Sequence, residues 1–162
     1  MKVGILTVSD KGARGEREDR SGPAIREMIE AAGGEVVRAR IVPDEREDIR
    51  AALIDWSDEG LDLVLTTGGT GFSPRDWTPE ATKSVLEREA PGLAEAMRRA
   101  GAEKTPTAIL SRAVAGIRKA TLIVNLPGSE KAVRESLAAI LPALAHGIGV
   151  LKGTDAECGR HG

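Results

Sequence analysis

Short apolar runs alternate with segments of helical periodicity along most of this 162-residue chain. The runs are rich in Val, Ile and Leu, as strands are when they are buried on both faces of a sheet. Strands that alternate with helices are joined by crossover connections, so neighbouring strands run parallel and helices cover both faces. We therefore expect an α/β fold with a mostly parallel sheet. The predicted strands are Val3–Val8, Glu35–Val42, Leu61–Thr66 and Thr121–Leu126.

Helices are predicted between these strands from apolar spacing and from terminal glycine and proline residues. A polar loop is expected over Lys11–Ser21, and Pro142 is expected to kink the last helix. The segment Ala108–Ala115 is compatible with either a strand or turns. The predicted helices are one from Ser21 to the glycines at 33–34, one capped by Asp44 and ending at Trp56, one over Pro79–Arg88 capped by Thr78, one over Pro91–Ala102, and one from Pro127-Gly128-Ser129 to about His146.

The composition is that of one ordinary globular domain, with 41% apolar and 30% charged residues. A net charge of −2 and an aromatic content of 2% argue against a nucleic-acid partner. The single Cys158 excludes an intrachain disulfide and a cysteine-rich metal site. No apolar run reaches transmembrane length and no signal peptide is recognisable, so we expect a cytoplasmic protein with no membrane partner. One domain is expected over residues 1–151, followed by a flexible tail over 152–162 that contains Cys158 and His161.

Polar or glycine-rich residues follow each of the four predicted strands. The carboxyl ends of parallel strands meet at one edge of a sheet, and ligands of such folds bind beyond that edge. We therefore expect these residues to surround a single site. The four stretches are Ser9-Asp10, Pro43-Asp44, Thr67–Asp76 and Pro127-Gly128-Ser129.

The central stretch of the chain is Leu65–Ala81, LTTGGTGFSPRDWTPEA. Its glycines permit positive φ angles and close approach of a ligand. It lacks the lysine of a Walker loop and the third glycine of a dinucleotide fingerprint. Main-chain N–H groups and threonine hydroxyls remain as ligands, which favours a phosphate, while a tight strand-to-helix turn is the alternative. The residues concerned are Thr67, Gly68, Gly69, Thr70 and Gly71.

Two carboxylates at strand ends, Asp44 and Asp76, are candidate Mg²⁺ ligands, because Mg²⁺ binds a few carboxylates together with substrate phosphates. Asp44 could instead cap a helix, and Asp76 could pair with Arg75 or cap a turn. Asp10 and Asp19 are weaker candidates of the same type. Together with the glycine loop, these carboxylates are suited to phosphoryl or nucleotidyl transfer between two bound phosphates.

Two further stretches leave alternatives open. In Ser111-Arg112, the guanidinium could clamp a phosphate or be solvated. Pro127-Gly128-Ser129 could bind a phosphate or simply supply a helix N-cap. His146 lies near a helix end, where a structural role is expected.

Several of these motifs together resemble the MogA/MoaB family of molybdenum cofactor biosynthesis proteins. The glycine stretch TTGGTGF-x-PRD-x-TPEAT looks like the signature of that family, and the similarity extends from about Val3 to Gly149. The corresponding domain of gephyrin is similar as well. The other matching segments are Leu6–Asp10, Asp19–Pro23, Val42–Asp44, Pro106–Arg112 and Asn125–Gly128.

The resemblance implies a three-layer α/β/α fold, usually a homotrimer and sometimes a hexamer. It also implies adenylylation of molybdopterin by ATP with Mg²⁺, releasing pyrophosphate. A non-catalytic, MoaB-like molybdopterin carrier is the alternative, since Ser129-Glu130 replace the Asn-Pro or Gln-Pro of many relatives. Asp44 and Asp76 match the acidic residues for metal and catalysis. The implied substrate-binding residues are Ser9, Asp10, Thr67, Gly68, Gly69, Thr70, Gly71, Arg75, Ser111, Arg112, Pro127, Gly128 and Ser129.

Overall fold

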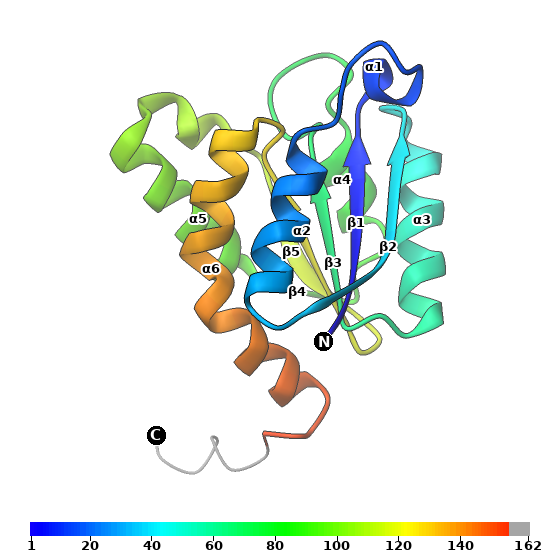
Figure 1. The fold of residues 1–162 in the computed structure, drawn as a ribbon, viewed down its shortest axis with the longest axis vertical. Coiled ribbons are helices and arrows are strands. Elements are labelled where there is room, and N and C mark those ends of the chain that lie inside the picture. The colour runs from blue at the N-terminus through cyan, green and yellow to red at the C-terminus, as the bar shows by residue number, and fades with distance from the viewer. Residues whose placement is uncertain (156–162) are drawn as a thin grey trace.

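The computed structural model describes residues 1–155, which form a six-stranded sheet between two layers of helices (Figure 1). The strands are β1 (Lys2–Val8), β2 (Glu35–Val42), β3 (Leu63–Thr67), β4 (Arg88–Glu89), β5 (Ala115–Arg118) and β6 (Thr121–Leu126). The helices are α1 (Asp10–Ala13), α2 (Ser21–Ala31), α3 (Arg46–Glu59), α4 (Thr78–Lys83), α5 (Pro91–Lys104) and α6 (Glu130–Leu151), with a 3₁₀ helix η1 (Pro106–Leu110).

The sheet has the strand order β2-β1-β3-β6-β5-β4. The pairs β1–β2, β1–β3 and β3–β6 are parallel, whereas β5 pairs antiparallel with both β6 and β4. The predicted mostly parallel sheet is therefore confirmed, and the strands β2 and β6 have the predicted bounds. Cys158 and His161 lie outside the described residues.

Alternate residues of the central strands face two separate cores. Val3 and Ile5 of β1 pack with the apolar faces of α2, α5 and α6. Leu6 and Val8 pack on the opposite face with α3 and α4. Gly4 lets Trp56 of α3 pack directly on the sheet, because a Cβ there would lie 2.7 Å from Trp56 Cε3. Because successive side chains of β1 point to opposite faces, the strand packs against a helical layer on each side of the sheet.

Four connecting segments differ from the sequence-based prediction. The predicted loop after β1 contains the short helix α1, because Ser9 Oγ accepts a hydrogen bond from Gly12 N at 3.0 Å and caps it. Helix α3 continues past Trp56 to Gly60, which ends it with a φ of 90°. Helix α4 ends at Lys83, and the rest of the predicted helix is a turn followed by β4. The undecided segment 108–115 belongs partly to η1 and reaches β5 only at Ala115.

Helix α6 continues through Pro142, which lies on its exposed side, and ends beyond the predicted end near His146. Contrary to the sequence-based expectation, α6 is long and apolar enough to cross a membrane by length and composition alone, with a mean hydropathy of 1.2 over 18 residues. Its buried residues nevertheless lie along one face and pack against the sheet, as those of a core helix do. Past its end, Lys152 Nζ is 2.7 Å from Asp62 Oδ1, which ties this part of the chain to the sheet.

Asn125 of β6 is the centre of a buried polar network. Its Nδ2 donates to Thr66 Oγ1 at 3.0 Å and to Thr82 Oγ1 at 2.9 Å. Its Oδ1 accepts from Val114 N at 3.2 Å. The side chain is fully buried, so water cannot replace these partners. The network therefore joins β6 to β3, to α4 and to the segment before β5.

We expect Asn125→Leu to lower the free energy of unfolding by about 3 kcal/mol or more, because it leaves several buried polar groups without partners. Urea unfolding measures this loss. The control is Ile123→Val at a neighbouring buried position, which removes one methylene and is expected to cost about 1 kcal/mol. An Asn125→Leu variant no less stable than the control would contradict the role of the network.

Candidate functional site

The four parallel strands end at the same edge of the sheet, and their following segments diverge there. β2 lies on one side of β1 and β3 on the other, while α2 and α3 cover opposite faces. The chain therefore changes direction between β1 and β3, which is the usual ligand position in such sheets. The four polar stretches found in the sequence all lie at this edge.

The glycine loop after β3 requires its glycines. Gly68 has a φ of 97° and Gly69 a φ of 68°, a region that favours glycine. A Cβ on Gly68 would overlap Val8 O, and a Cβ on Gly69 would overlap Thr78 Oγ1. Thr78 does not act as the predicted N-cap, because its hydroxyl donates to Gly68 O at 2.9 Å and Trp77 occupies the cap position. The loop is thus packed against the end of β1 at Val8 and hydrogen-bonded to the start of α4 at Thr78.

Main-chain N–H groups of this loop and of the first turn of α6 are available to an anion. Within residues 1–155, the N–H groups of Gly69, Thr70 and Gly71 donate none of the hydrogen bonds that fix the loop. Ser129 caps α6 by accepting from Ala132 N at 3.2 Å, which confirms the predicted N-cap. A helix N-terminus carries partial positive charge, so both groups favour phosphate.

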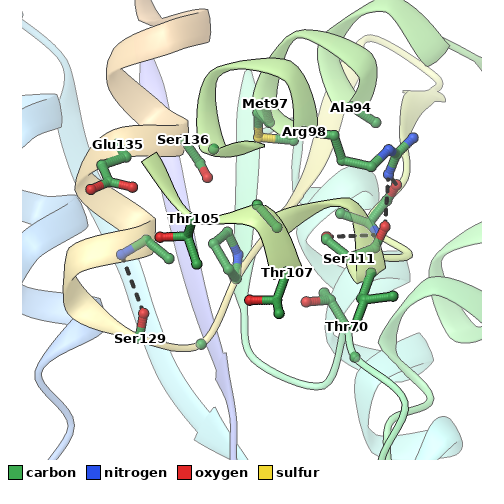
Figure 2. A pocket seen from close by; sticks show the side chains of 18 of the residues that line it. Thr70, Ala94, Met97, Arg98, Thr105, Thr107, Ser111, Ser129, Glu135 and Ser136 are labelled. Atoms are coloured by element: carbon green, nitrogen blue, oxygen red, sulfur yellow. Dashed lines mark hydrogen bonds between the residues drawn. The ribbon is translucent and has the colours of Figure 1, made fainter. Parts of the chain in front are cut away.

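Two cavities flank the loop. The first, of about 590 Å³, lies between the loop, α5, η1 and the start of α6 (Figure 2). The second, of about 750 Å³, lies between the loop, the end of β1 and the segment before α2. Both are lined by Gly69, Asp76, Gly128 and Ser129, so the loop and the start of α6 form a common boundary.

The two cavities differ in chemistry. Apolar side chains such as Met97 and Leu110 line the first, together with the hydroxyls of Thr105 and Ser111 (Figure 2). Charged side chains are more frequent in the second, which includes Arg17, Asp19, Arg20 and Asp44. The first therefore suits a partly apolar group, and the second suits a charged one.

Asp44 is not the predicted helix cap, because Glu45 occupies that position of α3. Its Oδ2 accepts from Asp10 N at 2.8 Å. Burial raises the pKa of the Asp44 carboxyl, the Asp10 N–H opposes this, and the charges of Asp10 and Asp76 add to it. A carboxylate held among like charges in this way is suited to binding a cation.

Asp10 and Arg75 form a different kind of arrangement. Arg75 Nε donates to Asp10 Oδ2 at 2.8 Å, and Arg75 Nη2 donates to Glu45 Oε1 at 2.8 Å. The hydrogen bond from Arg75 lowers the pKa of the Asp10 carboxyl, against a smaller opposing effect of burial. Asp10 also accepts from Asp44 N at 3.0 Å, so this ion pair supports the main chain beside Asp44. Neither Asp10 nor Arg75 lines the two cavities.

Asp76 lies at the common boundary, whereas Arg75 pairs elsewhere. The Oδ2 atom of Asp76 accepts from Ser73 N at 3.1 Å, so one of the two alternatives for Asp76, the turn cap, is present. That contact uses one carboxylate oxygen and leaves the residue exposed to both cavities. Within residues 1–155, no group of three or more His, Cys, Asp and Glu side chains could hold a metal. A cation here would rely on Asp44, Asp76 and its own ligands.

The pair Ser111-Arg112 divides between two roles. Ser111 lines the first cavity, whereas Arg112 lines neither. The Arg112 side chain is about one-third exposed, and its guanidinium is held by protein acceptors, since it donates to Gly71 O at 2.8 Å and to Asp76 O at 2.7 Å. Thr67 lines the second cavity, and its hydroxyl donates to Pro127 O at 2.7 Å.

Several lining residues were not singled out from the sequence. Thr105, Thr107 and Lys131 line the first cavity, and Arg17 lines the second. Asp19, a weaker sequence candidate, is an anchor, because its carboxylate accepts from Thr7 Oγ1 at 2.9 Å and from Gly22 N at 3.0 Å. Proximity to the Ser111 motif is the one signal that pointed towards Thr105 and Thr107.

Comparison with known proteins shows the family to which this chain is related. Residues 4–146 match the family described as "Probable molybdopterin binding domain". The chain is 46% identical over 156 residues to the molybdopterin adenylyltransferase of Helicobacter pylori strain J99, covering 94% of this chain and 89% of that protein. It is 45% identical over 159 residues to gephyrin of Dictyostelium discoideum, covering 92% of this chain but only 22% of gephyrin.

Solved structures agree with this assignment. The structure described as the molybdopterin biosynthesis enzyme MoaB from Thermus thermophilus is 58% identical, with a TM-score of 0.90. The match covers 94% of this chain and 96% of that one. A TM-score of 0.90 over most of both chains means that the two proteins share one fold.

We expect Asp44→Asn and Asp10→Asn to change stability in opposite directions in metal-free buffer. The raised pKa of Asp44 means that its ionised form is disfavoured in the folded state, so stability is lost as pH rises through the acidic range. Asp44→Asn should therefore have an equal or higher Tm than the unaltered protein at pH 7, with the difference shrinking on acidification.

The lowered pKa of Asp10 predicts the reverse for the control. Asp10→Asn should have a lower Tm at pH 7, and the deficit should shrink as pH falls through the titration range of Asp10. Thermal unfolding followed from pH 7 to pH 3 measures both trends. A Tm deficit of Asp44→Asn at pH 7 equal to that of Asp10→Asn would contradict the electrostatic assignment.

Proposed function

The chain belongs to the molybdopterin-binding family described above, and we propose that it catalyses the Mg-ATP-dependent adenylylation of molybdopterin. In this reaction an oxygen of the terminal phosphate of molybdopterin attacks the α-phosphorus of ATP. A new P–O bond forms, the bond between the α-phosphorus and the oxygen bridging to the β-phosphate breaks, and pyrophosphate leaves. The products are adenylyl-molybdopterin and pyrophosphate.

The observation that supports this reaction is the pair of cavities with a common boundary at Gly69, Asp76, Gly128 and Ser129. A transfer between two phosphate-bearing substrates needs two adjacent compartments whose phosphates meet at one place. Positioning of this kind supplies much of the rate enhancement in such reactions. A single pocket with one phosphate site would instead suit a binding protein.

The boundary also offers the charge that meeting phosphates require. The N–H groups of the glycine loop and the first turn of α6 supply partial positive charge without a mobile side chain. Because these donors belong to the main chain, they need little reorganisation when charge develops in the transition state.

Mg²⁺ fits the donor set of this site. Asp44 and Asp76 would hold it, since Mg²⁺ needs only one or two carboxylates when phosphates and water complete its shell. Burial and the neighbouring charges of Asp10 and Asp76 disfavour the ionised Asp44 carboxylate, and a cation relieves both effects. When bound, the ion neutralises phosphate charge and polarises the reacting phosphorus.

The remaining expected properties belong to the same proposal. Resemblance to the family supports a homotrimer, with a hexamer as the alternative assembly, and we propose that the protein is cytoplasmic. The net charge of −2 and the scarcity of aromatic residues support a protein without a nucleic-acid partner.

A non-catalytic molybdopterin carrier is the second candidate. Its support is Ser129-Glu130 after the last glycine, where many similar sequences carry Asn-Pro or Gln-Pro. A carrier binds molybdopterin and gives no adenylylated product. Retention of both Asp44 and Asp76 favours the enzyme.

The deciding experiment incubates the protein with molybdopterin and Mg-ATP and detects adenylyl-molybdopterin by mass spectrometry and pyrophosphate by a coupled assay. We expect both products, and only when all three components are present. Saturable molybdopterin binding in calorimetry without either product would support the carrier and overturn the enzyme.

We expect Asp76→Asn to lower kcat by at least about 100-fold, because it removes a charged group at the place where the phosphates meet. Its Tm should stay close to that of the unaltered protein, since this carboxylate makes one exposed turn contact. The control is Asp58→Asn, an exposed carboxylate paired with Lys119 outside both cavities, which should keep full activity. Unchanged turnover of Asp76→Asn would count against the assigned site.

A further inference from the structure

Arg112 contacts the glycine loop with both its main chain and its side chain. Its N–H donates to Thr70 O at 2.8 Å. Its guanidinium donates to Gly71 O at 2.8 Å through Nε and to Asp76 O at 2.7 Å through Nη2. One residue therefore fixes three carbonyls on either side of the turn that carries Asp76.

Apart from Arg112, the loop is tethered by the side chain of Arg75, which pairs with Asp10 and Glu45, and by one main-chain bond between its ends. Gly69 O accepts from Thr78 N at 3.1 Å, which anchors the two ends of the loop to each other. Between these ends, the bonds of the Ser73–Asp76 turn are internal to the loop. Within residues 1–155, each hydrogen bond that joins the main chain of residues 70–76 to the rest of the protein comes from Arg112.

Glu80 orients the guanidinium of Arg112. It pairs with Arg112 Nη1, and both side chains are about one-third exposed. Its second oxygen, Oε2, is buried and has no hydrogen-bond partner within the described residues. A half-buried carboxylate of this kind depends on its cation, so the guanidinium is held by charge on one side and by carbonyls on the other.

Only an arginine can make this set of contacts. The guanidinium is planar and directs its N–H groups in fixed directions, so Nε, Nη1 and Nη2 reach three separate acceptors at once. Lysine keeps the charge but concentrates its donors on one atom. An Arg112→Lys substitution therefore tests geometry while it preserves electrostatics.

We propose that Arg112 is a positioning residue for adenylyl transfer: it touches no substrate, and it holds the loop so that Asp76 stays at the common boundary of the two cavities. This inference rests on the proposed function. A catalytic group that is displaced by about 1 Å costs on the order of 100-fold in rate, although ground-state binding can survive. Loss of the Arg112 contacts should therefore change kcat far more than KM.

The experiment compares Arg112→Lys with Arg118→Lys. Arg118 is the matched control, because it is also a partly buried arginine that donates to a carbonyl, Val85 O, at 3.1 Å, and it lies on β5 outside both cavities. Steady-state kinetics give kcat and both KM values, thermal unfolding gives Tm, and hydrogen–deuterium exchange reports the mobility of residues 70–77.

For Arg112→Lys we expect kcat to fall by about 10- to 100-fold, with each KM within about 3-fold of the unaltered value. Exchange should rise in residues 70–77 and remain unchanged in the central strands. Arg118→Lys should retain kcat and normal exchange in that loop, even where its Tm falls as much. The split between kcat and KM is what a merely structural arginine would not produce.

Should Arg112→Lys not fold, the double variant Arg112→Gln/Glu80→Gln removes the dependent carboxylate as well and is measured in the same way. Either variant with kcat within about 2-fold of the unaltered protein, or with unchanged exchange in residues 70–77, overturns the inference. A raised KM at normal kcat also overturns it, because Arg112 would then bind substrate. Absence of product from the unaltered protein would instead refute the proposed function, and the exchange data would still decide whether Arg112 holds the loop.

Discussion

Close packing of main chain at Gly68 is the constraint on which the site depends. The N–H of Gly68 donates to Leu126 O at 3.2 Å, so the chain leaving β3 is bound to the end of β6. Gly128 approaches so closely that a Cβ on it would lie 3.3 Å from Gly68 Cα, and a Cβ on Gly68 would overlap Val8 O. Three strand ends can converge here only because side chains are absent. The positive φ angles that follow turn the loop towards the two cavities.

The pKa values of two carboxylates at this edge, Asp10 and Asp44, are shifted in opposite directions. The shifts distinguish a residue that supports the structure from one suited to binding a ligand. Asp10 is neutralised by Arg75, and its oxygens hold the main chain of Asp44. Within residues 1–155 Asp44 makes no ion pair, and burial together with the charges of Asp10 and Asp76 raises its pKa against a smaller effect of Arg75. A carboxylate kept in an unfavourable state by its surroundings indicates a site maintained for a ligand rather than for stability. The fold tolerates that arrangement because the ion pair beside it fixes the neighbouring backbone.

The two cavities differ in their lining, and they meet at a common boundary. Apolar and hydroxyl-bearing residues of α5 and η1 line one cavity, while charged residues beside β1 line the other. Their common boundary consists mainly of main chain, with Asp76 as the charged side chain. Arg112, which the sequence grouped with the ligand-binding residues, instead binds the carbonyls of the loop. The donors that face a ligand and the donors that hold the loop are thus separate groups.

The sequence by itself determined the alternation of strands and helices, the positions of β2 and β6, and the glycine loop, because hydrophobic periodicity and glycine placement are local properties. It also located the edge of the sheet where the polar stretches meet. Tertiary structure alone decided that Arg75 pairs with Asp10, that Thr78 bonds the loop instead of capping α4, and that Arg112 clamps it. The contacts of Arg75 with Asp10 and of Arg112 with Gly71 join residues more than 40 positions apart, and the Thr78 contact spans the whole glycine loop, so no local pattern encodes them. The same reason hid Thr105 and Arg17, whose roles as lining residues arise only when α5, η1 and the segment before α2 fold around the loop.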